Sequence, residues 1–98
     1  MSFIQIIEHQ TSRMEEIAKL AEEMRAQRGD DRTVTRMTVA ADRDNPGHYY
    51  TIVEFESYET AMANSDDPRT QEFAARFAEL LDAPPVFRNL DVVVQETT

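Results

Sequence analysis

Apolar residues recur along the chain with two different periods, and these predict two kinds of secondary structure. Phe3–His9 is a short, mostly apolar run that is too brief for a buried helix, so it predicts a strand. From Met14 onward, apolar residues recur at three- and four-residue steps, which predicts an amphipathic helix of about four turns. Ser12 and Glu15 have the spacing of a capping box at its start, and Gly29 can supply the positive φ that ends it.

The second half of the chain predicts three more strands and two helices. The β-branched and aromatic runs that read as strands are Thr33–Ala41, His48–Glu56 and Val86–Glu96. Residues 42–47, Asp-Arg-Asp-Asn-Pro-Gly, have the composition of a hairpin loop. Ser57 is placed to cap a short helix that runs through Asn64, and Asp67-Pro68 to start a second helix that ends before Pro84-Pro85.

The predicted order is strand, helix, strand, strand, helix pair, strand, which is typical of a ferredoxin-like βαββαβ arrangement. This fold class is α+β, with an antiparallel sheet and helices on one face. Apolar residues occupy both faces of the strands, whereas a wet face would be polar. The residues expected on the face away from the helices are Ile4, Ile6, Tyr50, Ile52, Phe87 and Val93. We expect a second copy to cover them in a homodimer; the alternative is that they are ordinary exposed apolar residues.

Composition narrows the classes of partner. The 98 residues fit one domain, 1–98, and 10 Lys+Arg against 19 Asp+Glu give a net charge of −9. Such a charge argues against nucleic acid and anionic membranes as partners. The chain has no cysteine, and we see no signal peptide or membrane span, so we expect a cytoplasmic protein.

The region after the hairpin loop resembles a known family. Residues 50–61, Tyr-Thr-Ile-Val-Glu-Phe-Glu-Ser-Tyr-Glu-Thr-Ala, are similar to the strand-then-helix signature of the dimeric α+β barrel superfamily. Within it, the branch of antibiotic biosynthesis monooxygenase (ABM)-like domains is most similar, and the likeness continues through Pro84-Pro85 to the last strand. The resemblance implies a homodimer with a ligand cavity between sheet and helices. It also implies cofactor-independent oxygenation of electron-rich aromatic molecules in that cavity.

The sequence departs from the heme-degrading branch of the same superfamily. It contains no Trp, and the resemblance places Gln5, Asn64 and Ala74 where that branch has its Asn, Trp and His. Without an imidazole there, iron has no axial ligand, so we expect neither heme degradation nor any cofactor. The two histidines are far apart in sequence and no cysteine accompanies them, so we expect no metal site.

The resemblance and the strand pattern together nominate a set of site residues. The candidate catalytic residues are Asn64, His48 and Arg36, and the candidate ligand-binding residues are Gln5, Tyr49, Phe55, Phe73 and Phe77. They would supply donors and a proton acceptor in a mostly apolar cavity.

Each of these residues also has a structural interpretation. Gln5 can make a structural hydrogen bond, Arg36 can pair with an acidic residue across strands, and Asn64 can cap its own helix. His48 and His9 stand at strand ends, where imidazoles are often solvated, and the aromatic residues can be ordinary core. Two functions therefore stay open: a cofactor-independent monooxygenase, or a non-catalytic, ligand-binding or stress-associated dimeric module.

Overall fold

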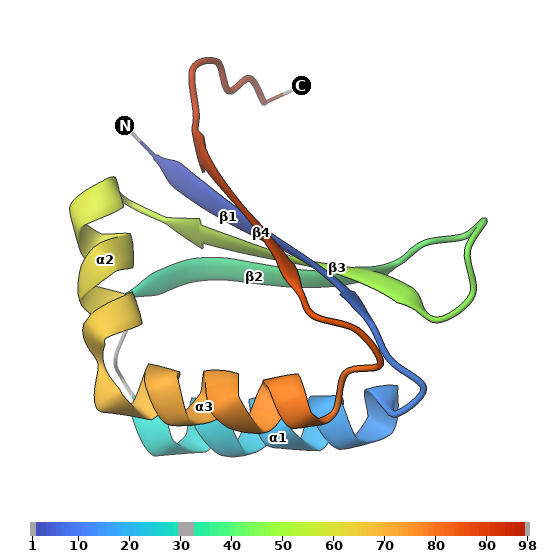
Figure 1. Cartoon of the computed structure of the whole chain (residues 1–98). Coiled ribbons are helices and arrows are strands. Elements are labelled where there is room, and N and C mark those ends of the chain that lie inside the picture. Colours follow the sequence, from blue (N-terminus) through green and yellow to red (C-terminus); the bar gives the residue numbers. More distant parts are fainter. Residues whose placement is uncertain (1, 30–32, 98) are drawn as a thin grey trace.

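The computed structural model of the protein describes residues 2–29 and 33–97. Figure 1 shows the elements in the order β1 (Phe3–Gln10), α1 (Met14–Arg28), β2 (Val34–Ala41), β3 (His48–Phe55), α2 (Tyr58–Asp66), α3 (Pro68–Glu79) and β4 (Val86–Asp91). The predicted order is confirmed. The predicted extension of the last strand to Glu96 is wrong: β4 ends at Asp91, which pairs with Phe3, the first residue of β1, and one more hydrogen bond, of 3.0 Å, follows from the N–H of Val92 to the carbonyl of Ser2.

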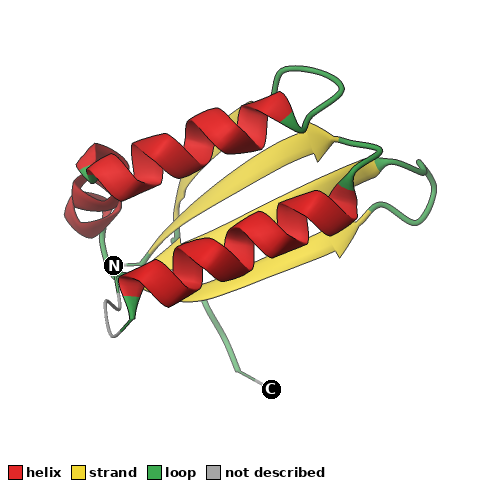
Figure 2. Ribbon diagram, turned by 90° about the horizontal axis from the view of Figure 1, so that it is seen from below, coloured by secondary structure: helices red, strands yellow, loops and turns green. Residues whose placement is uncertain are grey.

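The four strands form one antiparallel sheet in the order β2-β3-β1-β4. The helices lie on one side of it, with α1 and α3 running side by side and α2 near one end of the sheet (Figures 1 and 2). This is the predicted ferredoxin-like α+β fold. We call the two faces of the sheet the helix-facing side and the outer side.

Strand register assigns each residue to a side. Phe3 pairs with Phe55 and Ile7 with Thr51, and these residues face the helices, because Phe3 and Phe55 pack with Ala61 of α2. The residues between them in sequence face outward, so Ile6 and Ile52, which pair directly, lie on the outer side. By the same register, the outer side of the central strands carries Ile4, Ile6, Tyr50 and Ile52, as the sequence predicts.

The sequence analysis assigned the residues of the fourth strand to the wrong faces of the sheet. Phe87 pairs with Ile7 and therefore lies on the helix-facing side, where it stays 53% exposed at the sheet edge. Val93 lies beyond the end of β4 and is 79% exposed. Val86 and Leu90, which pair with Glu8 and Ile4, take their places on the outer side. The apolar pattern misleads here because pairing with β1, not burial, sets the register of this edge strand.

The apolar core has two separate parts. One lies under α2 and consists of Phe3, Val53, Phe55 and Ala61, with Val34 and Met62 packed against it. The other lies where α1 and α3 meet the sheet and consists of Ile17, Leu20 and Phe77, with Ile7, Met14, Phe73, Leu80 and Leu81 packed against it. The two parts of the core share no residue. The middle of the helix-facing side therefore has an apolar cluster on each flank.

Two helices begin as the sequence predicts. The hydroxyl oxygen of Ser57 accepts a hydrogen bond of 3.1 Å from the backbone N–H of Thr60, and the Asp67 carboxylate accepts one of 2.8 Å from the N–H of Arg69. At the end of α1, Gly29 has a φ of +58°. The longest helix, α1, has 15 residues, and no helix within the described ranges is long and apolar enough to cross a membrane.

The predicted capping box at the start of α1 is wrong. The Ser12 hydroxyl points to Asp82, 3.5 Å away, and α1 has no side-chain cap hydrogen bond. Instead the buried hydroxyl oxygen of Thr11 accepts from the N–H of Arg13 at 2.9 Å and donates to the carbonyl of Leu80 at 2.7 Å. The same threonine thus ties the start of α1 to the end of α3, which a local sequence motif does not reveal.

Candidate functional site

The middle of the helix-facing side carries a pair of amides. Gln5 lies between Phe3 and Ile7 along β1, hence between the two apolar clusters, and faces Asn89 on β4. Its Nε2 donates to Asn89 Oδ1 at 3.0 Å. Gln5 is half-buried and Asn89 exposed, so the pair is accessible from solvent. The sequence interpretation of Gln5 as a hydrogen-bonded amide is confirmed; its partner, Asn89, was not foreseen, because the fourth strand was assigned to the wrong face.

His9 lies at one end of the helix-facing side of the sheet. It is 3% exposed, and its Nε2 lies 2.9 Å from the hydroxyl oxygen of Thr51. Its ring stacks on Tyr49, with centroids 5.9 Å apart, and meets Phe77 edge-on at 5.0 Å. The other ring nitrogen, Nδ1, is buried without a hydrogen-bond partner among the described residues.

These surroundings determine the charge of the ring. Burial lowers the pKa of His9 below its ordinary value of 6.5, so the imidazole is neutral at physiological pH. The expectation that His9 is solvated is wrong. His9 lies on the helix-facing side because it alternates along β1 with Phe3, Gln5 and Ile7. The same alternation is visible in the sequence, but the expectation of a solvated ring was based on the position of His9 at a strand end.

The aromatic residues expected in the ligand cavity divide between the two clusters. Tyr49 and Phe77 lie around His9, and Phe73 stacks on Phe77 with centroids 5.8 Å apart. Phe55 lies in the cluster under α2, against Phe3 at 6.3 Å. These rings are therefore not one continuous wall.

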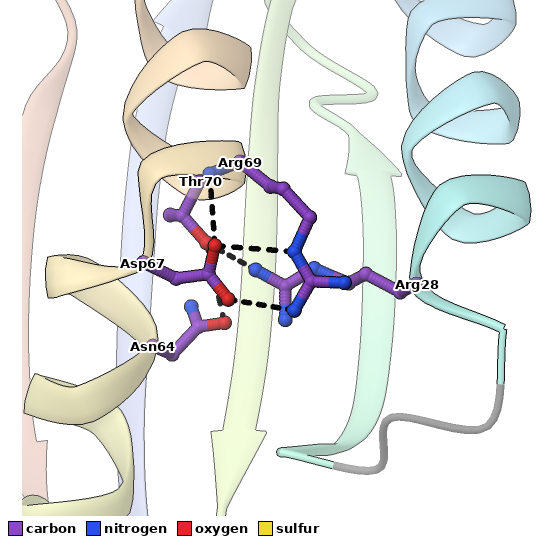
Figure 3. A network of polar contacts seen from close by, with 5 residues as sticks. All are labelled: Arg28, Asn64, Asp67, Arg69 and Thr70. Atoms are coloured by element: carbon purple, nitrogen blue, oxygen red, sulfur yellow. Dashed lines mark hydrogen bonds and ion pairs between the residues drawn. The ribbon is translucent and has the colours of Figure 1, made fainter.

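Asn64 lies in a polar cluster at the junction of α2 and α3 (Figure 3). Its side-chain Oδ1 accepts a hydrogen bond of 3.4 Å from the hydroxyl of Thr70, and that hydroxyl accepts one from the guanidinium of Arg28. Its backbone carbonyl accepts the N–H of Asp67 at 3.2 Å. The interpretation of Asn64 as the residue that caps its own helix is wrong, because α2 continues to Asp66, its C-cap is Asp67, and no described residue other than glycine has a positive φ. The side chain of Asn64 belongs instead to the polar cluster.

Arg36 and His48 do not lie with the other candidates. A β-bulge between Val34 and Arg36 turns Arg36 to the outer side, where it pairs in register with Glu54. Its Nε is 3.6 Å from Glu54 Oε2, which is the cross-strand ion pair that the sequence suggests. His48 pairs with Gln10 and also faces outward. The structure therefore brings Gln5, Tyr49 and Phe77 to one side of the sheet and turns Arg36 and His48 to the other.

Two hollows are described. One of about 130 Å³ lies where β1 ends and β3 begins, and is lined by Glu8, His9, Gln10, His48, Tyr49, Tyr50, Pro84 and Val86. Its volume is somewhat smaller than the roughly 150 Å³ of an apolar cavity that holds benzene. The other, of about 10 Å³, lies between α1 and α3. Neither is lined by Gln5, Phe55 or Asn64.

Within the ranges 2–29 and 33–97, no three His, Asp or Glu side chains come together in a way that could hold a metal ion. Several carboxylates are engaged with protein partners instead. Glu8, for example, accepts a hydrogen bond of 2.6 Å from Arg88 across β1 and β4.

No family model matches the sequence, and no curated protein matches it in sequence. Solved structures do match its fold. SnoaB, a cofactor-independent oxygenase from Streptomyces nogalater, has a TM-score of 0.80 at 12% identity, over 96% of this chain and 95% of that chain. Rv0793 from Mycobacterium tuberculosis has a TM-score of 0.79 at 13% identity, over 99% of this chain and 100% of that one.

A third structure is a candidate antibiotic biosynthesis monooxygenase from Nitrosomonas europaea. Its TM-score is 0.75 at 11% identity, over 94% of this chain and 90% of that chain. At such identities the likeness establishes the fold and not the activity. The chain therefore has the α+β fold of the ABM-like proteins, and the resemblance noted in the sequence is confirmed at the level of fold.

Proposed function

We propose that this protein binds a small, electron-rich aromatic molecule on the helix-facing side of its sheet and oxygenates it without a cofactor. The observation that carries the proposal is the Gln5–Asn89 amide pair, which is accessible and bordered by apolar clusters on both flanks. A few placed polar groups in apolar surroundings are typical of small-molecule sites. The likeness in fold to a protein described as a cofactor-independent oxygenase supports the same proposal.

The proposed oxygenation requires few protein groups. A phenol-type ring and O₂ give a quinone and water, so one oxygen atom enters the ring, the other leaves as water, and the substrate supplies all four electrons. The ring must first lose its hydroxyl proton, because the anion gives up an electron to oxygen far more readily. The protein has to accept that proton and stabilise the anion.

The helix-facing side offers groups for both tasks. The Nε2 of Gln5 and the side-chain N–H groups of Asn64 are donors for the anion. Thr51 is half-buried, and its hydroxyl links the helix-facing surface to the neutral ring of His9. We assign the proton to His9, reached through the Thr51 hydroxyl, with the substrate anion as the counter-ion that the buried ring otherwise lacks.

An oxygen electrode tests the enzyme. Wild-type protein should consume O₂ with at least one dihydroxynaphthalene or related dihydroxy-aromatic, with quinone formed, no hydrogen peroxide released, and label from isotopic O₂ in the product. Gln5→Leu should slow this reaction, while Gln10→Leu, an exposed change at the end of the same strand, should not. Consumption no faster than the protein-free blank across the panel would exclude the enzyme function.

The protein is also proposed to be a homodimer formed through the outer side. The central strands carry Ile4, Ile6, Tyr50 and Ile52 there, and the register adds Val86 and Leu90. By strand register these residues lie next to one another, so they form an apolar surface that a second copy would bury. Light scattering should give twice the chain mass of 11.3 kDa.

A non-catalytic binding protein with the same fold is the second candidate. It is favoured by the hydrogen bonds of the two amides: Gln5 donates to Asn89, and Asn64 accepts from Thr70. It is favoured also because neither described hollow is lined by these residues. Chemical-shift changes at Gln5 or Asn89 on adding a dihydroxy-aromatic, without O₂ consumption, would establish this function instead.

A further inference from the structure

The outer side of the sheet carries a short ion pair among its apolar residues. Nε of Arg88 donates to Oε2 of Glu8 at 2.6 Å, across β4 and β1. Arg88 stands between Val86 and Leu90 on the same face of β4, and Glu8 pairs in register with Tyr50 on β3. The Glu8 side chain is 32% exposed and the Arg88 side chain 59% exposed. The two charges are therefore flanked by apolar side chains and are still in contact with solvent.

The balance of charge distinguishes the outer side from the rest of the chain. Two acidic strand residues point outward, Glu8 and Glu54. Two basic ones, Arg36 and Arg88, do so as well, so the strand charges on this side sum to zero. The whole chain has a net charge of −9, so two copies repel each other over most approaches. An approach through the outer side avoids this repulsion.

The free energy of an ion pair changes when a second copy covers it. An exposed pair contributes little, because water and salt screen both charges. A covered pair has lost that water, and removal of one charge then leaves the other without compensation. Replacement of both charges by apolar side chains is often neutral. A covered pair is therefore recognised by a large effect of either single change and a small effect of the double change.

We propose that a second copy covers the Glu8–Arg88 pair when the homodimer forms, and that the pair is a specificity-determining contact of the interface. The inference rests on the homodimer of the proposed function and adds what selects a second copy over another apolar surface. In a two-fold dimer each copy brings one acid and one base to the same interface, so the charges of one copy are matched by those of the other. A partner without this pattern would leave them desolvated and unmatched.

Sedimentation of labelled protein measures the dissociation constant of the dimer in wild type, Glu8→Met, Arg88→Met and the double variant. Methionine is a long, unbranched side chain without a charge. Each single change should weaken the dimer about a hundredfold, because both copies then hold an unpaired charge in the interface. The double variant should dissociate within about threefold of wild type, because no charge is left without its partner.

Glu23→Met is the matched control. Glu23 accepts a hydrogen bond of 3.0 Å from Arg76, between α1 and α3, and both of these side chains are about half exposed. The control removes the same charge from the chain as Glu8→Met, but on the helix side of the sheet. It therefore reports any general effect of net charge, and its dissociation constant should stay close to that of wild type.

Unfolding of the monomer separates the interface from the pairing of β1 with β4. In an Ile52→Glu background, whose added charge on the outer side should prevent the dimer, urea unfolding reports the stability of one chain. Glu8→Met and Arg88→Met should leave it nearly unchanged there, because the pair is then exposed. A pair that acts only within one chain would instead lower this stability.

The outcomes distinguish this inference from the homodimer itself. Weak dimers in both single variants, with recovery in the double variant, support the inference. If wild type dimerises and the single variants dissociate no more than Glu23→Met, the inference is overturned and the homodimer stands. A double variant as weak as the single ones overturns it too, because the two charges then act separately. A wild-type mass of one chain at every concentration overturns both proposals.

Discussion

The Nε2 of His9 lies 2.9 Å from the hydroxyl oxygen of Thr51 on the neighbouring strand, while its Nδ1 is buried without a described partner. The ring is enclosed by the aromatic rings of Tyr49 and Phe77. A positive charge in this place would meet little water and no ion-pair partner among the described residues. The fold is therefore coupled to the protonation of a single core imidazole.

The first prediction is a loss of stability in mild acid. Burial lowers the pKa of His9 in the folded protein, whereas the unfolded chain keeps the ordinary value of 6.5. As the pH falls through 6.5 the unfolded chain binds a proton that the folded protein does not, so the free energy of unfolding decreases until the folded-state pKa is reached. The slope should approach at most about 1.4 kcal/mol per pH unit. Urea unfolding between roughly pH 7.5 and 5.5 measures it, above the range where most carboxylates titrate.

His9→Phe should remove this slope, because phenylalanine keeps the aromatic packing and cannot take up a proton. The matched control is His48→Gln, since the other histidine is half-buried on the outer side. The control should keep the slope. An equally steep loss of stability in His9→Phe would show that other groups cause it.

The second prediction concerns the dimer. Ile6 and Ile52 pair directly on the outer side, so Ile52→Glu places a charge in the middle of the proposed interface and should yield monomers. Phe87→Ser should leave the dimer intact, because Phe87 faces the helices. Sedimentation at several concentrations measures both. A wild-type mass of one chain at every concentration, or dissociation by Phe87→Ser alone, would contradict the assignment.

Much of the fold could be predicted because it depends on interactions between residues that are close in sequence. The caps at Ser57 and Asp67, and the positive φ of Gly29, each follow from one or two neighbouring residues. The order of elements follows from hydrophobic period and length alone. What the sequence could not show are features decided by distant partners, such as the role of Thr11 at the start of α1.

The candidate site was less predictable for the same reason. The face of β4 depends on its register with β1, and an error of one residue hides Asn89 and misplaces Phe87. The bulge before Arg36 likewise reverses the face of that residue, and no alternation reveals it. Gln5 and Tyr49 could be placed correctly because both lie on central strands with unbroken pairing.

The third prediction separates structure from binding at the amide pair. Because Gln5 and Asn89 are partly solvated, their hydrogen bond should contribute only about 0.5–1 kcal/mol to stability in a double-mutant cycle of Gln5→Leu and Asn89→Leu. Either change should weaken binding of a dihydroxy-aromatic about tenfold, since the ligand loses its polar contact. Calorimetry measures the binding and urea unfolding the stability. A large coupling energy with unchanged binding would make the pair purely structural.

The last prediction tests the charge preference of Asn64. If its N–H groups meet an oxyanion, Asn64→Ala should lower turnover by roughly 10²–10³, the usual effect of losing one such donor. Asn64→Asp should be at least as damaging, because a carboxylate has the same shape, donates nothing and repels the anion. A residue needed only for the backbone of the α2 end would largely tolerate aspartate, because the carbonyl bond to the Asp67 N–H stays in place and a negative charge in the last turn of a helix costs only about 0.3–1 kcal/mol. Steady-state rates, with far-ultraviolet circular dichroism and mass as controls for fold and dimer, therefore distinguish the two roles. Wild-type rates in Asn64→Asp would exclude Asn64 from anion stabilisation.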